Sequence, residues 1–187
     1  VDKITHKALW HKNIWTDFGG KEFPKWAIAQ NPLVYKNMVI VASQTQEAGI
    51  VAYDKQTGDV RWEQPLPETG FGHSTPVIVS VEGKPQMIFA ASAMSPSPKA
   101  LQSLDPANGQ PLWWCWGAGD AASVAYGSGR IYFDGGRGGP GVAVDPGGSG
   151  DISEARIRWK INQVPEGIGS PVIVDRLVYR LHVPNIL

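Results

Sequence analysis

The chain has 187 residues, of which 42% are hydrophobic, 17 are basic and 17 are acidic. This is enough apolar sequence for a packed core, and the balanced charge argues against nucleic acid or an anionic membrane surface as a partner. The single cysteine, Cys115, excludes an internal disulfide framework and a thiol-rich metal site. No apolar run is long enough to predict a membrane span in this segment.

Short strands separated by turns are predicted along the whole chain, without any helical periodicity. One strand is predicted at residues 7–14, followed by a connection at 15–24. Three groups of four strands, each called a round, then follow. The first round has strands at 32–35, 38–42, 49–53 and 60–63, and the second has strands at 74–80, 86–91, 99–104 and 111–115. The third round has strands at 123–126, 130–133, 141–144 and 155–159. A further round begins at 169–174 and 177–181. Residues 94–98 are predicted as a loop, because their two prolines do not suit a central strand.

A distinctive turn closes the first round of strands, in the segment 52–62. Ala52 and Tyr53 end a strand, and Asp54 can accept hydrogen bonds from backbone amides just beyond it. Thr57 and Gly58 supply a hydroxyl group and a residue that tolerates positive φ. Trp62, in the next strand, is too large and apolar to remain in water without a reason.

This turn recurs along the chain. Its second copy has Asp105, Gly109 and Trp113 at the same spacing, and a third copy begins at Asp145, contains extra residues and ends at Trp159. The tryptophans are therefore separated by roughly 50 residues, which is the period of a blade in a β-propeller. Trp10 fits the end of an earlier copy.

The repeat predicts an all-β chain made of four-stranded antiparallel blades. We interpret residues 1–187 as one partial propeller, with the end of a blade and a connection at 1–25, blades at 26–66, 67–116 and 117–161, and the start of another blade at 162–187. Three whole blades do not close a ring of about four to eight. We therefore expect a fragment whose first partners are the remaining blades of the same propeller.

The segment 52–62 resembles the tryptophan-docking motif of the quinoprotein-like propellers, with Ala52, Asp54, Thr57, Gly58 and Trp62 at the fixed positions. That superfamily includes pyrroloquinoline-quinone-dependent dehydrogenases and the non-enzymatic lipoproteins of outer-membrane β-barrel assembly. The resemblance implies a parent of seven or eight blades, most simply eight. It also implies a bacterial periplasmic or extracellular location, although this segment contains no signal peptide.

The same resemblance implies that the motif residues are structural and lock neighbouring blades together. These docking residues are Ala52, Asp54, Thr57, Gly58 and Trp62 of the first copy, Asp105, Gly109 and Trp113 of the second, and Asp145 and Trp159 of the third.

Three features were weighed as chemical sites. Gly136, Gly138 and Gly141 have the spacing of a dinucleotide fingerprint, but a strand and not a helix is predicted after them, which excludes that site. His73, at the entry to an inner strand, could serve as a base or metal ligand, yet it has no second ligand at a suitable spacing. The segment 113–116 contains three tryptophans around Cys115, and alternation within an outer strand favours packing over cofactor binding.

These observations favour a non-catalytic scaffold that is exported and binds proteins or extended ligands. The alternative is part of a pyrroloquinoline-quinone-dependent alcohol or sugar dehydrogenase, in which the full-length protein would bind the quinone with calcium. Such enzymes place the quinone on two adjacent cysteines, and this segment has one cysteine. A second alternative is a hydrolase or lyase whose site lies in the channel near His73.

Overall fold

The computed structural model describes residues 1–22, 27–45, 47–65, 72–92 and 96–184. They belong to two compact units, one made of Val1–Pro67 with Ala107–Gly109 and the other of Glu68–Pro106 with Gln110–Leu187. None of the helices in the described ranges is long and apolar enough to cross a membrane. Trp26, Leu66 and Pro67, which delimit the first predicted blade, lie outside the described residues.

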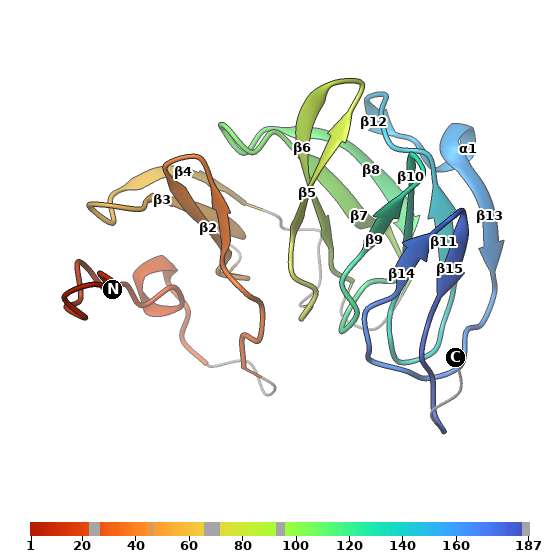
Figure 1. The fold of residues 1–187 in the computed structure, drawn as a ribbon, viewed down its shortest axis with the longest axis horizontal. Coiled ribbons are helices and arrows are strands. Elements are labelled where there is room, and N and C mark those ends of the chain that lie inside the picture. Colours follow the sequence, from red (N-terminus) through yellow and green to blue (C-terminus); the bar gives the residue numbers. More distant parts are fainter. Residues whose placement is uncertain (23–26, 46, 66–71, 93–95, 185–187) are drawn as a thin grey trace. The chain divides into compact units, whose positions relative to one another are not determined.

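The first unit contains one four-stranded antiparallel sheet in the order β1-β2-β3-β4 (Figure 1). Its strands are β1 (Leu33–Tyr35), β2 (Met38–Ala42), β3 (Ile50–Asp54) and β4 (Val60–Gln64). Every residue of β3 is buried, and Val51 and Tyr53 of this strand belong to a buried apolar cluster. The four predicted strands of this round are therefore confirmed.

The strand predicted at residues 7–14 is wrong, because no strand is assigned there. This segment contacts the sheet through side chains instead of backbone pairing. Trp10 and Ile14, together with Phe18 of the short 3₁₀-helix η1 (Thr16–Phe18), pack against the buried cluster of Ala48, Val51 and Tyr53.

The second unit contains a five-stranded sheet in the order β12-β8-β7-β6-β5. Its strands are β5 (Val77–Val81), β6 (Lys84–Ala90), β7 (Ser97–Leu104), β8 (Pro111–Gly117) and the short β12 (Gly150–Asp151). The loop predicted at 94–98 extends too far, since Ser97 and Pro98 already belong to β7. The register with β8 shifts between Ser97 and Leu101, and this irregularity accommodates the proline.

The same unit contains a four-stranded sheet in the order β13-β11-β10-β9. Its strands are β9 (Ala125–Gly127), β10 (Arg130–Asp134), β11 (Gly141–Val144) and β13 (Ile157–Ile161). The strand predicted at 155–159 begins later than expected, because Ser153–Arg156 form a one-turn helix, α1. Asp151 starts this turn by accepting hydrogen bonds from the backbone N–H and the hydroxyl group of Ser153.

A two-stranded hairpin follows, made of β14 (Val172–Val174) and β15 (Leu177–Tyr179), and β14 contacts β9. Ile173 lies against Gly127 on one face. The side chains of the other face are exposed, namely Val172, Val174, Leu177 and Tyr179. This hairpin lies in the range 162–187, for which the start of another blade is predicted.

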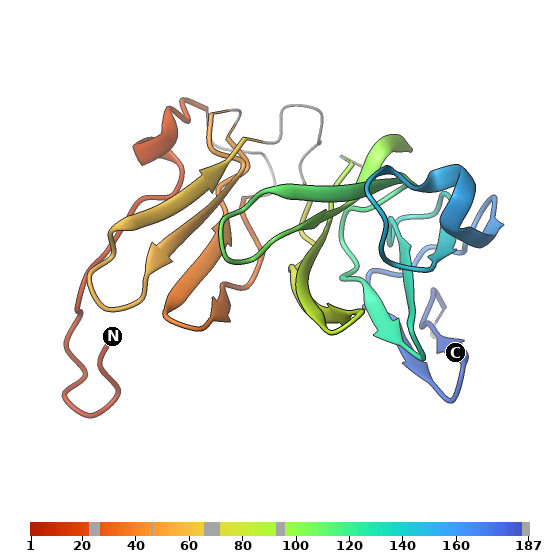
Figure 2. The same ribbon diagram turned by 90° about the horizontal axis from the view of Figure 1, so that it is seen from above.

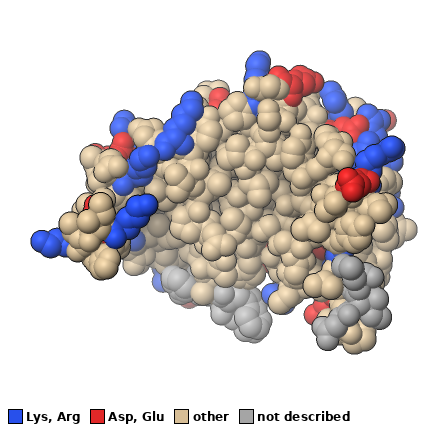
Figure 3. Space-filling view, in the orientation of Figure 1, with Lys and Arg blue, Asp and Glu red and all other residues tan. Residues whose placement is uncertain are grey.

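The core of the second unit lies between its two larger sheets (Figure 2). It includes Ile88, Leu101 and Trp113 from the five-stranded sheet and Phe133 and Val142 from the four-stranded sheet, all nearly inaccessible to solvent. The prediction of an all-β chain built from four-stranded antiparallel sheets in the manner of a propeller is confirmed. On the face shown in Figure 3, charged side chains of both signs are scattered between broad uncharged areas.

Candidate functional site

The best-defined polar feature of the first unit is the turn between β3 and β4. One carboxylate oxygen of Asp54 accepts hydrogen bonds from the backbone N–H groups of Gln56, at 2.8 Å, and Thr57, at 3.1 Å. Gly58 has a φ of 76° and donates its N–H to the carbonyl oxygen of Asp54. A side chain at Gly58 would be strained in this left-handed conformation, so the Thr57-Gly58 pair suits the turn.

A β-bulge immediately before the tryptophan is common to the three larger sheets. In the first sheet Ala52 pairs with Trp62 and Tyr53 pairs with Val60, which leaves Arg61 as the extra residue. The other two sheets repeat this register, with Ser103 opposite Trp113 and Ala143 opposite Trp159. The bulge therefore sets the face of the sheet on which each tryptophan lies.

The extra residue of the bulge is an arginine in two of the three copies, and it pairs with the aspartate of the turn. Arg61 Nη2 lies 2.6 Å from Asp54 Oδ2. This contact, with the two backbone N–H donors, lowers the pKa of Asp54 to about 2. In the third copy Arg158 contacts Asp145, which Arg130 also contacts at 2.8 Å. Burial alone would raise the pKa of Asp145, but the two guanidinium groups hold it below its usual value.

Two tryptophans of the first unit lie directly against glycines of these turns. A Cβ atom built on Gly58 would be 2.7 Å from Cδ2 of Trp10, and one built on Gly109 would be 2.5 Å from Cε3 of Trp62. The indole N–H of Trp10 also donates to the carbonyl oxygen of Lys55, at 3.1 Å. Only a glycine allows an indole ring to approach the backbone so closely at these positions.

The third tryptophan of the series, Trp113, is covered in a different way. It is completely buried, and its indole N–H donates to Oε1 of Gln86 at 2.8 Å. The extra residues of the third turn form β12, which adds to the outer edge of β8 with Gly150 opposite Trp113. Trp113 is therefore covered by a short strand from the third turn, whereas Trp10 and Trp62 are covered by the glycines of the first and second turns.

Trp159 remains partly open to solvent, with 38% of its surface exposed. Its ring lies 5.6 Å from that of Tyr132, and the two residues help to line a cavity of about 220 Å³ next to the β14–β15 hairpin. Arg130 and Arg176 also line this cavity. No glycine of the described residues lies against Trp159 in the way that Gly58 lies against Trp10.

His73, the candidate for catalysis, lies just before β5. Its backbone N–H donates to the carbonyl oxygen of Asp120 at 2.5 Å, and the N–H of Ser74 donates to the same oxygen at 2.9 Å. Nδ1 of His73 and Oγ of Ser74 are buried, and the described residues provide no hydrogen-bond partner for either. The carboxylate of Asp120 is instead paired with Arg137, at 2.7 Å. The described part of the chain therefore does not place a base or nucleophile in hydrogen-bonding reach of the imidazole.

The sequence did not reveal the ion pairs of the glycine-rich loop after β10, which are Arg137 with Asp120 and Asp134 with Arg180. Asp134 is fully buried and binds Arg180, whose side chain is only 10% exposed, at 2.7 Å. Asp134 also accepts the backbone N–H of Gly136, and Arg180 donates to the carbonyl oxygen of Gly167. The Asp134–Arg180 pair joins residues 46 positions apart, so no local motif could have indicated it. The loop leads into β11, as predicted, whereas a dinucleotide fingerprint would lead into a helix.

The tryptophan-rich segment lies in β8, and burial alternates along it as expected. Trp113 and Cys115 are fully buried, whereas Trp114 and Trp116 are half-buried. The ammonium groups of Lys99 and Lys160 lie 4.8 and 5.2 Å from the ring centres of Trp114 and Trp116. Cys115 is completely buried, and burial raises the pKa of its thiol to about 12, so that little of the reactive thiolate forms near neutral pH.

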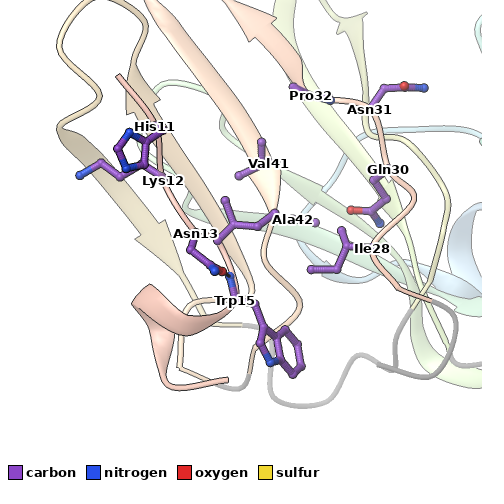
Figure 4. Close-up of a pocket in the computed structure, with 11 residues that line it drawn as sticks. His11, Lys12, Asn13, Trp15, Ile28, Gln30, Asn31, Pro32, Val41 and Ala42 are labelled. Atoms are coloured by element: carbon purple, nitrogen blue, oxygen red, sulfur yellow. Dashed lines mark hydrogen bonds between the residues drawn. The ribbon is translucent and has the colours of Figure 1, made fainter. Parts of the chain in front are cut away.

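A cavity of about 530 Å³ in the first unit is large enough for a small ligand (Figure 4). Its walls are mainly apolar, and polar side chains lie among them; the lining residues are His11, Lys12, Asn13, Ile14, Trp15, Ile28, Gln30, Asn31, Pro32, Val41 and Ala42. Among the described residues that line it, His11 and Lys12 are the ionisable ones, and Lys12 extends away from the other labelled side chains.

The described residues do not fit a quinone site with calcium. They contain no group of three or more His, Cys, Asp or Glu side chains that could hold a metal ion. Cys115 is buried within β8 and has no neighbouring cysteine in the sequence. The carboxylates of Asp54, Asp120 and Asp145 are already paired with arginines.

A family model described as outer membrane protein assembly factor BamB matches residues 1–185. Among solved structures, BamB from Moraxella catarrhalis is similar to the chain, with a TM-score of 0.52 and 16% sequence identity. The match covers 82% of this chain and 46% of that chain, so this chain spans less than half of the length of its structural relative. No curated protein matches the chain.

Proposed function

Because the chain belongs to the family described as outer membrane protein assembly factor BamB, we propose that it is part of an exported, non-catalytic propeller that binds other proteins or extended ligands. The family match over residues 1–185 carries this proposal. The location that goes with it is the periplasm or the periplasmic side of the outer membrane of a bacterium. The remaining blades of the same propeller would be the first partners of this chain.

The use of charge in the blades supports a structural role for the repeat. The aspartates of the first and third turns are engaged by arginines of the same sheet. The carboxylate of Asp54 stabilises the turn that faces Trp10, and in both copies the arginine that pairs with the aspartate lies in the bulge that follows the turn. We propose that the docking residues of all three copies hold neighbouring blades together in this way, through contacts of the kind made by Trp10 with Gly58.

A cellular experiment tests the proposed role in outer-membrane protein assembly. Deletion of the gene for the full-length protein should lower the amount of folded outer-membrane proteins, measured by their heat-modifiable migration on gels. The wild-type gene on a plasmid should restore that amount. An unchanged level of folded outer-membrane proteins in the deletion strain would contradict an assembly role.

A titration separates the scaffold from the dehydrogenase alternative. The full-length protein is mixed with pyrroloquinoline quinone and calcium, and tryptophan fluorescence is recorded. We expect no saturable quenching, because the residues described here do not fit that site. Quenching that saturates at one equivalent, followed by dye reduction with alcohols or aldoses, would favour the dehydrogenase.

A further inference from the structure

Successive sheets of the second unit are linked by hydroxyl groups just before their first strands. The backbone N–H of Thr75 donates to Oγ of Ser123 at 3.0 Å, and the N–H of Ser123 donates to Oγ of Ser170, also at 3.0 Å. The two contacts join residues that are 48 and 47 positions apart. The same contact is thus made twice in succession, and we call the series the hydroxyl relay.

The residues of the relay occupy one position of the repeat. Thr75, Ser123 and Ser170 each lie two residues before the first strand of a sheet, which is β5, β9 and β14 in turn. A proline follows both Thr75 and Ser170. Because proline has no N–H and favours extended backbone in the residue before it, that residue carries the available donor at the entry to the strand. Asn31, which also has a side-chain oxygen, lies at the same distance before β1.

The relay satisfies backbone donors at the edges of the sheets. Both β5 and β9 are edge strands, since each has one neighbour in its sheet. Edge strands leave backbone N–H groups open to unwanted pairing. The contact between Thr75 and Ser123 is also partly buried, where an N–H group without an acceptor would destabilise the fold. A hydroxyl group suits this position because it accepts a hydrogen bond while the N–H of its own residue donates the next one.

The last described member of the relay, Ser170, has no next partner in the part of the chain that the structure describes. Its Oγ accepts the N–H of Ser123, but none of the described residues accepts its own N–H. Ser170 is also exposed. The chain spans less than half of the length of its structural relative, so the next member is expected in the blade that comes after this segment.

We propose that the hydroxyl relay continues into the next blade, where the N–H of Ser170 donates to a side-chain oxygen about 47 residues further along the chain. The acceptor belongs to a serine, threonine, asparagine or aspartate two positions before the first strand of the next sheet. This inference rests on the proposal that the remaining blades are partners of this chain. It names the group that holds the next blade at this point.

The link that the structure contains is tested in the full-length protein by hydrogen exchange of single backbone amides, measured by NMR. Ser123→Ala removes the acceptor, so the amide of Thr75 should exchange about tenfold faster or more. Ser123→Thr keeps an acceptor oxygen and should preserve the protection. Ser80→Ala is the matched control, because Ser80 is an exposed residue of β5 outside the relay. The amides of β7 should keep their wild-type rates in all three variants, which separates a local effect from a general loss of stability.

The proposed link is tested in the same way. The amide of Ser170 should exchange about tenfold more slowly or less than in an unstructured peptide of the same sequence. Alanine in place of the acceptor about 47 positions later should abolish this protection. Exchange of the Ser170 amide at the peptide rate, or protection that survives the alanine, would overturn the continuation.

The relay and the assembly role can fail separately. An unchanged Thr75 amide in Ser123→Ala, or an equal effect of Ser80→Ala, would overturn the relay itself. If the relay is overturned while the full-length protein restores folded outer-membrane proteins to the deletion strain, the assembly role stands. Protected amides in a protein that does not restore them would support the relay and contradict the assembly role.

Discussion

The indole ring of Trp10 lies against the backbone of Gly58, so closely that a Cβ atom on the glycine would be 2.7 Å from Cδ2 of the ring. Gly58→Ala should therefore displace Trp10 from the sheet. We expect a loss of about 1–2 kcal/mol for the positive φ and a further loss of about 1–3 kcal/mol for overpacking against the ring. Urea unfolding followed by tryptophan fluorescence measures both the loss and the exposure of the indole.

A matched control isolates the effect of the ring. Gly83 has a φ of 79°, close to that of Gly58, and a Cβ atom there would meet nothing within 4 Å. Gly83→Ala should therefore show only the backbone cost of about 1–2 kcal/mol. Equal losses in the two variants would mean that the contact with Trp10 contributes nothing to stability.

The tryptophans of β8 and β13 occupy equivalent positions in their sheets but differ in burial, at 0% and 38% exposed. Trp113→Ala should cost about 3–5 kcal/mol, the usual range for a large buried aromatic side chain. Trp159→Ala should cost less than half of this, because its ring is still partly hydrated. Thermal melts of the two variants make the comparison, and an equal fall in Tm would show that burial does not decide the role of these residues.

The sequence was a good guide to the sheets because the repeat constrains them several times over. The spacing from Asp54 to Trp62 recurs from Asp105 to Trp113, and the structure gives both segments the same bulge before the tryptophan. The glycine at the same place in both segments, Gly58 and Gly109, has a positive φ of 76°, as the turn predicted from the sequence requires.

The sequence did not reveal how the third turn would use its extra residues. The segment from Pro146 to Arg156 is longer than the corresponding part of the other copies, and this difference can be read from the sequence. The sequence does not show that Gly150 pairs with Trp113, because Trp113 belongs to β8 of a different sheet. The Asp134–Arg180 pair was missed for a similar reason, since the two residues are distant in sequence and meet only through the fold. The strand predicted at 7–14 failed because alternation predicts a strand but does not supply a neighbour for its backbone.

The hydrogen bonds to Asp54 predict a specific dependence of stability on pH. The pKa of this group falls from its usual 3.8 to about 2 in the folded chain. A lowered folded pKa gives stabilisation that is complete above about pH 4 and is lost as the pH falls towards 2. Asp54→Asn should remove this contribution, so that the variant loses less stability than the wild type over that interval. Urea midpoints measured between pH 2 and pH 6 test the prediction, which would fail if the two curves were parallel.

Cys115 should be inert in the folded chain. It is completely buried, and burial raises the pKa of its thiol to about 12, so little thiolate forms near neutral pH. A disulfide reagent at pH 8 should label it only when urea is added, as followed by mass spectrometry. Ile152→Ala, which removes an anchor of the segment that covers β8, should speed up labelling without urea. Rapid labelling of the wild type would contradict the buried position.

The pair formed by Asp134 and Arg180 offers a test of long-range coupling in the second unit. Arg180→Met leaves a buried carboxylate without its partner and should cost about 3–5 kcal/mol, the range for breaking a buried ion pair. Asp134→Asn in the Arg180→Met background should then cost less than it does in the wild type, because the uncompensated charge has been removed. A double-mutant cycle in urea measures the coupling. Arg61→Met is the control, because the Arg61 side chain is exposed in its pair with Asp54 and its removal should cost less stability. Additive effects of the Asp134 and Arg180 substitutions would show that the two groups do not depend on each other.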